Sequence, residues 1–555
     1  MKKTMSLLLV LLLCLGLMSG CGSDAAPAPG EAPTDSSAAT DIASSDTAGN
    51  PSDSEASVYP LCTDGSITLS IMLPLTQYAP GSMSNYLDGT NLVWPEVLKR
   101  TGVNLDMTCV ANASYQEQAN LTIVSQILPD IMQVMNYAGG MDQAYDDGLF
   151  VELNDYQQYF PNYMKYVNMS DANQKAAYSE GGHMMGLSQV AEKTKPATLG
   201  MYVRQDWLDT LNLEIPTKIS EWHDMLLAFK NNITGGGAPM DWSSDGFLIS
   251  NFMCGNYGIC GGLGGYWVVR DNRVIYSPAD EGFRSYLEEL HSWYNEGLIN
   301  QDFMSNELGA QFSGNMDLIS SNTVGALQLT ISMGGAFFRN IGMLPEDGYY
   351  TMAPFPLNED GSLAKVQPIG KYAATVGNGG WMISAESQQI EHALQFLDYF
   401  YSDEGLILTN YGIEGETFEY DENGKPMQNE FMTANPTYSQ LQAQELYLIH
   451  NYFILSVDRE FANIDEEGMK CWDYMNTPGE YNMPALSFTA DETSENASIA
   501  SDLETFISEM TIKWIIGSEE LTDSSWNAYL QKLSSMNYET LVSNYQAAYD
   551  RWLAK

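Results

Sequence analysis

The stretch Leu128-Pro-Asp-Ile-Met-Gln-Val-Met-Asn-Tyr-Ala-Gly-Gly140 encloses a short apolar segment between a Pro-Asp turn and a polar, glycine-rich loop. A short apolar run bounded by turn residues predicts a buried strand, here over 131–135. The residues just before it, near 115–127, are predicted to form a helix. A strand that follows a helix and ends in a loop is the repeating unit of an α/β fold with a largely parallel sheet.

The segments on the amino-terminal side have the same order of elements. The apolar run 67–73 predicts a strand that leads into a loop with Gln77 and Tyr78. A short helix is expected over 91–100, and an alternating strand is expected over 103–110. Together with the stretch around 131, these elements predict one α/β unit.

Three later helices are predicted from apolar residues with helical spacing. They cover 283–294, 390–401 and 538–552. Asp280 is placed to cap the first of them and Gly297 to end it. The sequences 270–274 and 421–425 are typical of hairpin turns. Aromatic residues in such stripes usually form the core, so they are not candidates for ligand contacts.

Acidic residues dominate the charge of the chain. Its 555 residues include 24 Lys and Arg against 71 Asp and Glu, which gives a formal net charge of −47 at pH 7. Binding to nucleic acid depends on clustered basic residues, so this charge excludes a nucleic-acid partner and disfavours an anionic membrane surface. A hydrophobic fraction of 44% is ample for a packed core, and the length predicts more than one domain.

The first residues form an export signal. Lys2 and Lys3 precede the apolar run 5–18, which is too short to span a bilayer as a stable helix. Small residues then lead into Cys21, an arrangement that resembles a bacterial lipobox. We predict a signal peptide over 1–20 and lipidation of Cys21, which would hold the protein at the extracellular face of the cell membrane. The alternative is an ordinary signal peptide followed by a chance cysteine.

Residues 21–66 are predicted to form the lipidated amino terminus and a disordered tether. Ala, Pro, Ser, Asp, Gly and Thr dominate this segment, and little of it can be buried. A segment of this composition cannot offset the entropy lost on ordering. The folded part is therefore expected to begin at about Ile67.

Five cysteines remain once the signal peptide and Cys21 are set aside. They are Cys62, Cys109, Cys254, Cys260 and Cys471. An odd number leaves at least one thiol unbridged or paired with another molecule. Cys254 and Cys260 could form a local disulfide in their glycine-rich segment, or both could be isolated buried thiols.

Sequence motifs for catalysis and for cofactors are missing. No Gly-x-Ser-x-Gly run, Walker loop or dinucleotide fingerprint occurs. The five histidines are scattered, with no His-x-x-x-His pair, so a zinc site has no support. We expect no cofactor and no enzymatic activity, although 71 acidic residues would allow a pair of glycosidase carboxylates to be chosen almost anywhere.

Several short motifs occur in an order that resembles the family 1 extracellular solute-binding lipoproteins of ABC importers, in particular the large oligosaccharide-binding subgroup of Gram-positive bacteria. Each motif is weak alone, and their shared order over about 67–555 is what makes the resemblance specific. The motifs are Leu128-Pro-Asp-Ile131, Gly148-Leu-Phe-Val-Glu-Leu-Asn-Asp-Tyr156, Phe160-Pro-Asn-Tyr163, Tyr202-Val-Arg-Gln-Asp-Trp-Leu208, Pro216-Thr217 with Glu221-Trp222, Trp293-Tyr-Asn-Glu-Gly-Leu-Ile299 with Asp302-Phe303, Tyr401-Ser-Asp-Glu-Gly405, Tyr411-Gly-Ile-Glu-Gly-Glu416 and Tyr549-Asp-Arg551.

The resemblance implies a two-lobed α/β fold of the type II periplasmic-binding-protein kind, which closes on a ligand in the cleft between its lobes. It assigns 67–195 and 366–412 to the first lobe, and 196–365 and 413–555 to the second. It implies a receptor that captures an oligosaccharide without breaking a bond and delivers it to ABC permease subunits. The protein is expected to be a monomer.

One feature of the family is absent here. Many members carry a calcium-binding loop after the helix that begins at Glu221-Trp222. In this chain the corresponding residues, 231–240, contain no carboxylate, and Asp241 is the first to follow. Calcium needs several oxygen ligands, usually with multiple carboxylates, so no metal is expected at this place.

Ligands of α/β sheets meet the loops at the carboxyl ends of the strands. This rule selects Gln77, Tyr78, Asn136, Tyr137, Met333 and Phe337. Sugar rings stack their C–H faces on aromatic rings and need hydrogen-bond partners for their hydroxyls. A tryptophan beside a carboxylate, or after flexible backbone, meets that need, which adds Asp241, Trp242 and Trp381.

Two arginines and one further tryptophan are also candidates for ligand contact. Arg204 and Arg339 are expected near the cleft and would matter for a uronic acid, although Arg204 could instead pair with Asp206. Trp267 is a weaker candidate for ligand contact. The tryptophans predicted to lie in the core are Trp207, Trp222, Trp293 and Trp472.

Three other functions remain compatible with the sequence. The same scaffold could bind a peptide or another non-sugar solute, and an extended strand-binding groove would favour that. A secreted glycosidase would need two carboxyl groups about 5–9.5 Å apart. A surface adhesin or signalling co-receptor would bind its ligand without supporting uptake.

Overall fold

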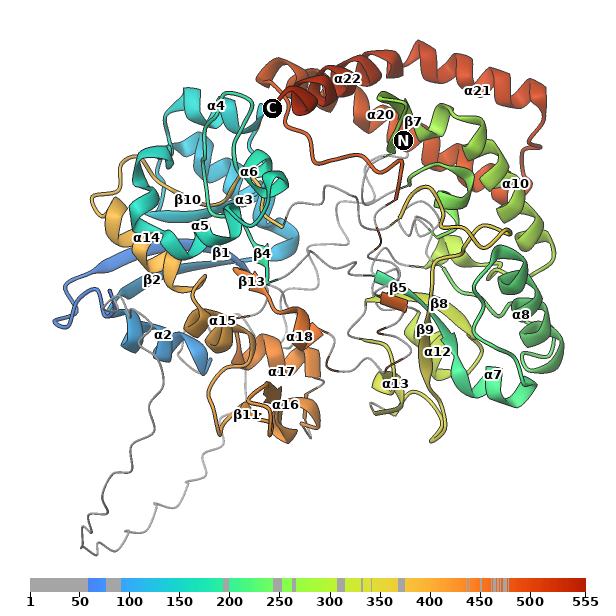
Figure 1. Cartoon of the computed structure of the whole chain (residues 1–555), viewed down its shortest axis with the longest axis horizontal. Coiled ribbons are helices and arrows are strands. Elements are labelled where there is room, and N and C mark those ends of the chain that lie inside the picture. The colour runs from blue at the N-terminus through green and yellow to red at the C-terminus, as the bar shows by residue number, and fades with distance from the viewer. Residues whose placement is uncertain are drawn as a thin grey trace, which may run out of the picture. The chain divides into compact units, whose positions relative to one another are not determined.

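Figure 1 shows the computed structural model of the chain. It describes residues 58–75, 91–192, 199–242, 252–261, 266–306, 315–330, 333–340, 342–367, 375–435, 437–438, 440–449, 452–460, 462, 466, 469, 471–472, 477 and 479–555. The two larger sheets among these residues have four and three strands, and each lies in its own hydrophobic core.

The four-stranded sheet has the order β10-β3-β1-β2. Its strands are β1 (Thr68–Leu75), β2 (Asn104–Ala111), β3 (Ile131–Val134) and β10 (Gly380–Ile383). β1 pairs in parallel with β2 and β3, whereas β10 pairs antiparallel to β3. The predicted strands and the largely parallel sheet are therefore confirmed. β1 is buried over most of its length, as is typical of a parallel strand covered on both faces, and β2 is an edge strand that stays half exposed.

Helices surround this sheet and complete the first core (Figure 1). They are α2 (Val93–Thr101), α3 (Asn112–Ser125), α4 (Gly140–Asp147), η1 (Asn154–Tyr159), α5 (Pro161–Val167), α6 (Asp171–Ala177), α14 (Ile390–Tyr399), α15 (Asp403–Asn410), α16 (Glu430–Thr433) and α17 (Gln440–Tyr447). The predicted hairpin at 421–425 joins β11 (Phe418–Tyr420) to β12 (Pro426–Gln428).

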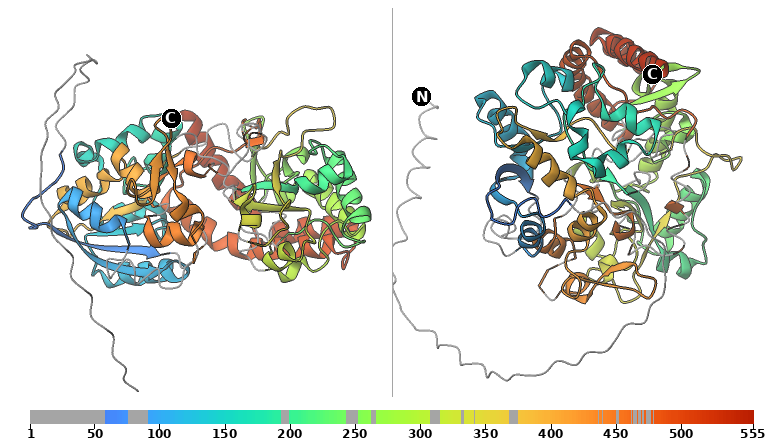
Figure 2. Two further views of the ribbon diagram at one scale, coloured as in Figure 1. Left: turned by 90° about the horizontal axis from the view of Figure 1, so that it is seen from below. Right: turned by 60° about the vertical axis from the view of Figure 1, so that its left-hand side comes forward.

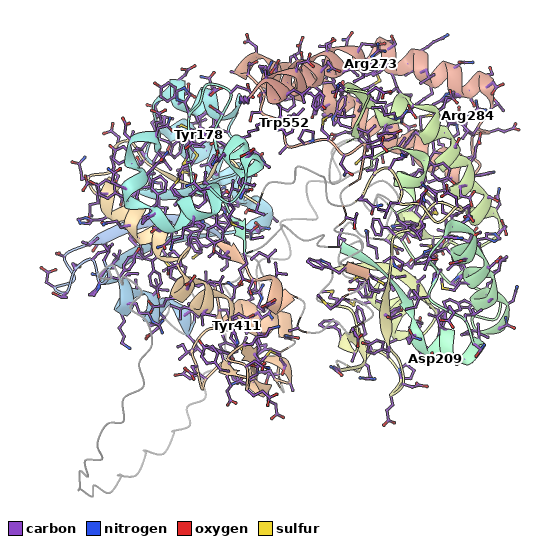
Figure 3. All side chains as sticks on the ribbon, viewed as in Figure 1. Tyr178, Asp209, Arg273, Arg284, Tyr411 and Trp552 are labelled. Carbon is purple, nitrogen blue, oxygen red and sulfur yellow. The ribbon has the colours of Figure 1, made fainter. Side chains whose placement is uncertain are left out.

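The chain stays with the first core for longer than predicted. β13 (Ile454–Leu455) pairs in parallel with β4 (Val190–Ala191). Tyr411, labelled in Figure 3, is buried, and its hydroxyl lies 3.3 Å from Ser456 Oγ. Ile454 belongs to the first core and Val457 to the second. The two hydrophobic cores therefore divide after Leu455 and not at 413, where the change of lobe is expected, and the lobe boundaries stay a prediction.

The three-stranded sheet has the order β8-β5-β9 and lies in the second core. β5 (Leu199–Arg204) pairs antiparallel with both β8 (Ala326–Thr330) and β9 (Tyr350–Ala353). All six residues of β5 are buried, since the strand is central in its sheet and covered on both faces.

The rest of the second core combines segments that are far apart in the sequence, coloured green to yellow and red in Figure 2. They are α7 (Gln205–Leu211), α8 (Ile219–Asn232), η2 (Cys254–Tyr257), β6 (Trp267–Arg270), β7 (Arg273–Tyr276), η4 (Ser277–Ala279), α10 (Glu281–Asn295), η5 (Phe303–Ser305), α12 (Met316–Ser320), α13 (Phe337–Asn340), α18 (Val457–Glu460), α20 (Ala490–Ile515), α21 (Asp523–Ser535) and α22 (Tyr538–Ala554).

The predicted helices and turns of this region are confirmed. Asp280 caps α10 by accepting a hydrogen bond from the backbone N–H of Gly282 at 2.9 Å, and Gly297 follows the helix with a φ of 64°. Asp271 and Asn272 have φ values of 50° and 60° between β6 and β7, as a tight hairpin turn requires.

Packing of the body begins before Ile67. The Tyr59 hydroxyl donates to the carbonyl oxygen of Gln395 at 2.6 Å, and the Tyr59 ring meets Tyr399 edge-on with centroids 5.2 Å apart. The Leu61 N–H donates to the carbonyl oxygen of Thr101 at 2.8 Å. The tether predicted to end at residue 66 therefore ends several residues too late, and 21–57 lie outside the described residues.

Two further expectations concern covalent and membrane features. Cys254 and Cys260 are both buried and are not joined by a disulfide. None of the helices that the structure describes is both long enough and apolar enough to cross a bilayer.

Candidate functional site

The sheet of the second core has one edge at which four parallel segments end. Met240 forms parallel bridges with Ile299 and with Ala326 of β8. Because β5 is antiparallel to both β8 and β9, those two strands run in the same direction as the bridged segments. The four carboxyl ends therefore meet at one edge, where ligands of α/β folds are expected. We call it the carboxyl edge.

A buried polar cluster orders this edge. Asp241, which is 3% exposed, accepts hydrogen bonds at Oδ1 from Asn300 Nδ2 at 2.8 Å and from Asn306 Nδ2 at 2.9 Å. Asn306 Nδ2 also donates to the carbonyl oxygen of Trp242 at 2.5 Å, and Asn315 Nδ2 donates to Asn306 Oδ1 at 2.7 Å. Burial raises the pKa of Asp241, and the amide donors oppose that rise. The cluster ties together the segments that leave the sheet here.

Gln328 of β8 is a polar residue of the same region that the sequence analysis did not select as a site residue. Its side chain is 3% exposed, yet neither Nε2 nor Oε1 has a hydrogen-bond partner among the described residues. A polar residue between two leucines of the strand Ala326-Leu-Gln-Leu-Thr330 was the signal that could have found it. A buried amide without partners is unusual and costs stability.

The two tryptophan candidates are covered by protein. Trp242 is 3% exposed and packs against Phe252, with ring centroids 5.5 Å apart. Trp381 is 2% exposed, and its ring stacks on Phe453 with centroids 5.2 Å apart. The position of Trp381 inside the first core does not favour ligand contact, whereas Trp242 lies at the carboxyl edge. Both contacts remain predictions.

Five further tryptophans with predicted roles lie in or against the second core. Trp207, Trp222 and Trp293 are buried there, as predicted, and Trp472 packs against it. Trp267 is also buried, and it stacks on Tyr545 with centroids 3.8 Å apart. Its role as a weak candidate for ligand contact therefore gains no support.

Arg204 takes the structural role that was its alternative. The side chain is buried, Nε donates to Asp206 Oδ1 at 2.8 Å, and Nη2 donates to Asp206 Oδ2 at 2.6 Å. Nη1 donates to Asn322 Oδ1 at 2.5 Å. Three of its five N–H groups are used by these two residues, which supports the structural role, and contact between Arg204 and a uronic acid stays a prediction.

The two candidates after β3 follow the four-stranded sheet and differ in burial. Asn136 is exposed, and its carbonyl oxygen accepts a hydrogen bond from Gln116 Nε2 at 3.3 Å. Tyr137 is buried, and its hydroxyl donates to Asp147 Oδ2 at 2.7 Å. The candidates after β1, Gln77 and Tyr78, lie outside the described residues.

The candidates after β8 do not join the cluster at the carboxyl edge. Gly335 forms a bridge with Tyr350, the first residue of β9, so the segment from Met333 onward runs back along the sheet. Met333 and Phe337 are half-buried and pack against the second core. Arg339, at the end of this segment, is also half-buried.

The loop after α8 is closed by its own backbone. The Gly236 N–H donates to the carbonyl oxygen of Lys230 at 3.0 Å, and the Gly237 N–H donates to that of Thr234 at 3.2 Å. Among the described residues no three His, Cys, Asp or Glu side chains are grouped so that they could hold a metal ion. The expectation of no metal at 231–240 stays a prediction.

Comparison with known proteins defines the class. Residues 90–407 match the bacterial extracellular solute-binding protein family, and the chain belongs to that family. Its two-lobed α/β fold is the type II fold of such proteins. Among curated relatives, lipoprotein LipO of Bacillus subtilis is 22% identical, with 81% of this chain and 86% of LipO covered. The polygalacturonan/rhamnogalacturonan-binding protein YtcQ of the same organism is 21% identical, with 82% and 87% covered.

Solved structures share the fold over nearly the whole folded part. The alginate-binding protein AlgQ2 superposes with a TM-score of 0.69 at 23% identity, and the alignment covers 88% of this chain and 99% of AlgQ2. The substrate-binding protein FusA of S. pneumoniae, solved in complex with kestose, has a TM-score of 0.68 at 18% identity and the same coverage.

Proposed function

We propose that this protein is an extracellular receptor that captures an oligosaccharide for an ABC importer and releases it unchanged. The observation that supports this most directly is the carboxyl edge, where the cluster of Asp241, Asn300 and Asn306 lies beside Trp242. Carboxylate and amide groups next to an indole suit the hydroxyls and C–H faces of a sugar ring. YtcQ is named as a polygalacturonan/rhamnogalacturonan-binding protein and AlgQ2 as an alginate-binding protein, and FusA was solved in complex with kestose. All of these ligands are carbohydrates.

Ligand capture would come from closure of two lobes about a hinge. The first would comprise residues from about 59 to 195 and from about 366 to 455, and the second would comprise the intervening and following residues. The separate hydrophobic cores, one built mainly from 67–190 and 376–454 and the other from 201–355 and 457–549, support this division. Gln77, Tyr78, Asn136 and Tyr137 would then supply ligand contacts from the first lobe.

We further propose that residues 1–20 are a signal peptide and that Cys21 is lipidated, with a tether holding a monomeric receptor outside a Gram-positive cell. The similarity to lipoprotein LipO supports the anchor. A dissociation constant near micromolar corresponds to about −8 kcal/mol, which is weak enough for release to a permease. No catalytic step is part of the proposal.

The test is a binding screen of the purified protein by calorimetry against a glycan panel, with a peptide library and the free monosaccharides as comparison ligands. We expect heat with at least one oligosaccharide and recovery of that glycan intact after prolonged incubation. Hydrolysis of the glycan would refute the receptor in favour of a glycosidase. Binding of peptides alone would show that the ligand is a peptide and not an oligosaccharide. Binding without uptake by cells that carry the permease would indicate an adhesin or co-receptor.

A further inference from the structure

The side-chain amide of Gln328 is a polar group without a partner in the interior of the second core. We propose that it is a ligand-binding group that hydrogen-bonds to the hydroxyls of an uncharged sugar ring, and that it selects neutral oligosaccharides over those made of uronic acids. This proposal rests on the proposed carbohydrate-binding function, and it adds the class of sugar and the residue that chooses it.

The register of the sheet places Gln328 next to the carboxyl edge. Gln328 is directly opposite Met201, which is opposite Ala353 of β9. Trp242 lies two residues beyond Met240, and Gln328 lies two residues beyond Ala326, the bridge partner of Met240. Alternation along β8 therefore puts the amide of Gln328 on the same face of the sheet as the side chain of Ala326, whose bridge partner Met240 leads into Asp241 and Trp242.

The bonding capacity of this amide is unused. A primary amide can donate two hydrogen bonds and accept two, and its burial without partners is unfavourable. Neither polar atom of Gln328 has a partner in the described part of the chain. Asp241, which is just as buried, accepts two hydrogen bonds at Oδ1 from Asn300 and Asn306. Other buried polar atoms of the second core, such as Trp222 Nε1 and Tyr529 OH, also lack a partner among the described residues, but each is a single atom, whereas Gln328 leaves both a donor and an acceptor open.

The chemistry of the amide favours a hydroxyl over a carboxylate. A sugar hydroxyl both donates and accepts, so it can pair with Nε2 and Oε1 together, whereas a carboxylate would leave Oε1 facing another acceptor. The neighbouring Asp241 adds a further carboxylate at the same edge. Arg204, the buried cation of this sheet, is committed to Asp206 and Asn322.

Two other observations bear on the charge of the ligand. A formal net charge of −47 disfavours the approach of a polyanion. Arg339 is the half-buried cation of this region, but it is carried by the segment that runs back toward the start of β9. The net negative charge and the position of Arg339 therefore favour an uncharged sugar ring at Gln328 over a uronic acid.

The experiment measures affinity and thermal stability of the wild type and of Gln328→Leu. The probes are neutral oligosaccharides, including kestose and maltotriose, and trigalacturonate as the uronic acid member. We expect the wild type to bind a neutral probe more tightly than trigalacturonate. We expect Gln328→Leu to bind that probe at least about 10-fold more weakly, while its Tm equals or exceeds that of the wild type.

A matched control is Gln444→Leu. Gln444 is a buried glutamine of the first core whose Nε2 donates to Gln428 Oε1 at 3.0 Å. This variant should lose thermal stability and keep the wild-type affinity. Gln328→Glu, which keeps the size of the side chain but adds a charge, should lower the affinity for the neutral probe as well.

The outcomes separate the two proposals. If the wild type binds no carbohydrate, the proposed function fails and the role of Gln328 fails with it. If the wild type binds a neutral probe and Gln328→Leu binds it within twofold, only the role of Gln328 is overturned. Tighter binding of trigalacturonate than of every neutral probe would overturn the selection of a neutral ring.

Discussion

Asn91 of the first core and Gln328 of the second carry the same amide group at nearly the same depth, 1% and 3% exposed. Asn91 Nδ2 donates to the carbonyl oxygens of Leu446 and Leu448, both at 3.0 Å, and its Oδ1 accepts from the N–H groups of Val93 and Trp94. Gln328 makes no comparable bond within the described residues. One amide joins two parts of the fold, and the other is left for something outside it.

The difference shows how a buried polar group can be assigned a role. Where every donor and acceptor is matched by the chain, the group stabilises the native state and its removal is costly. Where nothing in the chain matches it, the group lowers stability and is retained for another reason. The four predictions that follow test this distinction by changing buried side chains that make four, three, one and no side-chain hydrogen bonds with the residues that the structure describes.

The largest effect is expected for Asn91→Leu. The substitution removes four hydrogen bonds between this amide and buried backbone groups, so the free energy of unfolding should fall by about 4 kcal/mol. Urea denaturation followed by circular dichroism measures this. A loss below about 1 kcal/mol would mean that the four bonds of Asn91 contribute little, and the contrast with Gln328 would collapse.

The second effect depends on pH and concerns Asp398. Its carboxylate accepts hydrogen bonds from the Tyr163 N–H at 2.9 Å and from the N–H and Nδ2 of Asn162 at 3.2 and 2.9 Å. Burial raises the pKa of Asp398 to about 6, although these donors oppose the rise. The folded state therefore holds this proton more tightly than the unfolded state does.

The stability that Asp398 contributes is fully present below the pKa of about 3.8 in the unfolded chain and is lost as the pH rises to about 6. Relative to Asp398→Asn, which does not ionise, the wild type should lose about 3 kcal/mol across that window. Paired urea titrations at pH 4 and pH 6.5 measure the difference. A difference that is constant with pH, or that grows in favour of the wild type, would contradict the raised pKa.

A smaller loss is expected for Gln444→Leu. Its amide donates a single hydrogen bond to Gln428 Oε1 at 3.0 Å, so the free energy of unfolding should fall by about 1 kcal/mol. Thermal denaturation is sensitive enough to record it. A stability equal to that of the wild type would show that one partner is too few to define a structural amide.

The smallest effect has the opposite sign. Gln328→Leu removes an amide without partners and fills nearly the same volume with apolar atoms, so the free energy of unfolding should rise by up to about 1 kcal/mol. The same denaturation measurement without ligand tests it. A loss as large as that of Asn91→Leu would mean that Gln328 has partners after all and belongs with the structural amides.

Much of the fold could be predicted because its elements depend on local patterns. The strands at 67–73, 103–110 and 131–135 lie between turn residues, and Asp280 begins a helix whose apolar stripe is long. β10 could not be predicted from such signals. It has only four residues, and its pairing with β3 is set by the tertiary fold. The division of the two cores after Leu455 could not be predicted for the same reason, since the pairing of β13 with β4 depends on contacts distant in sequence.

The site was harder to predict than the fold. Asp241 and Trp242 were selected because a tryptophan stands beside a carboxylate, and the structure places both at the carboxyl edge. The rule of carboxyl ends selected Phe337, but a loop can turn back after its strand, and the bridge between Gly335 and Tyr350 shows that this one does. Gln328 was missed because a sequence shows that a residue is polar and not whether its hydrogen bonds are satisfied. That property appears only when the neighbours of the residue are known.

The pairing of β10 with β3 also constrains the order in which the protein can assemble. During synthesis and export, β1 to β3 emerge long before residues 380–383, and the whole β8-β5-β9 region is made in between. Until then β3 presents an open backbone edge that can recruit strands of other chains. Such distant contacts also slow folding. We therefore expect association between chains to compete with folding until β10 has paired with β3.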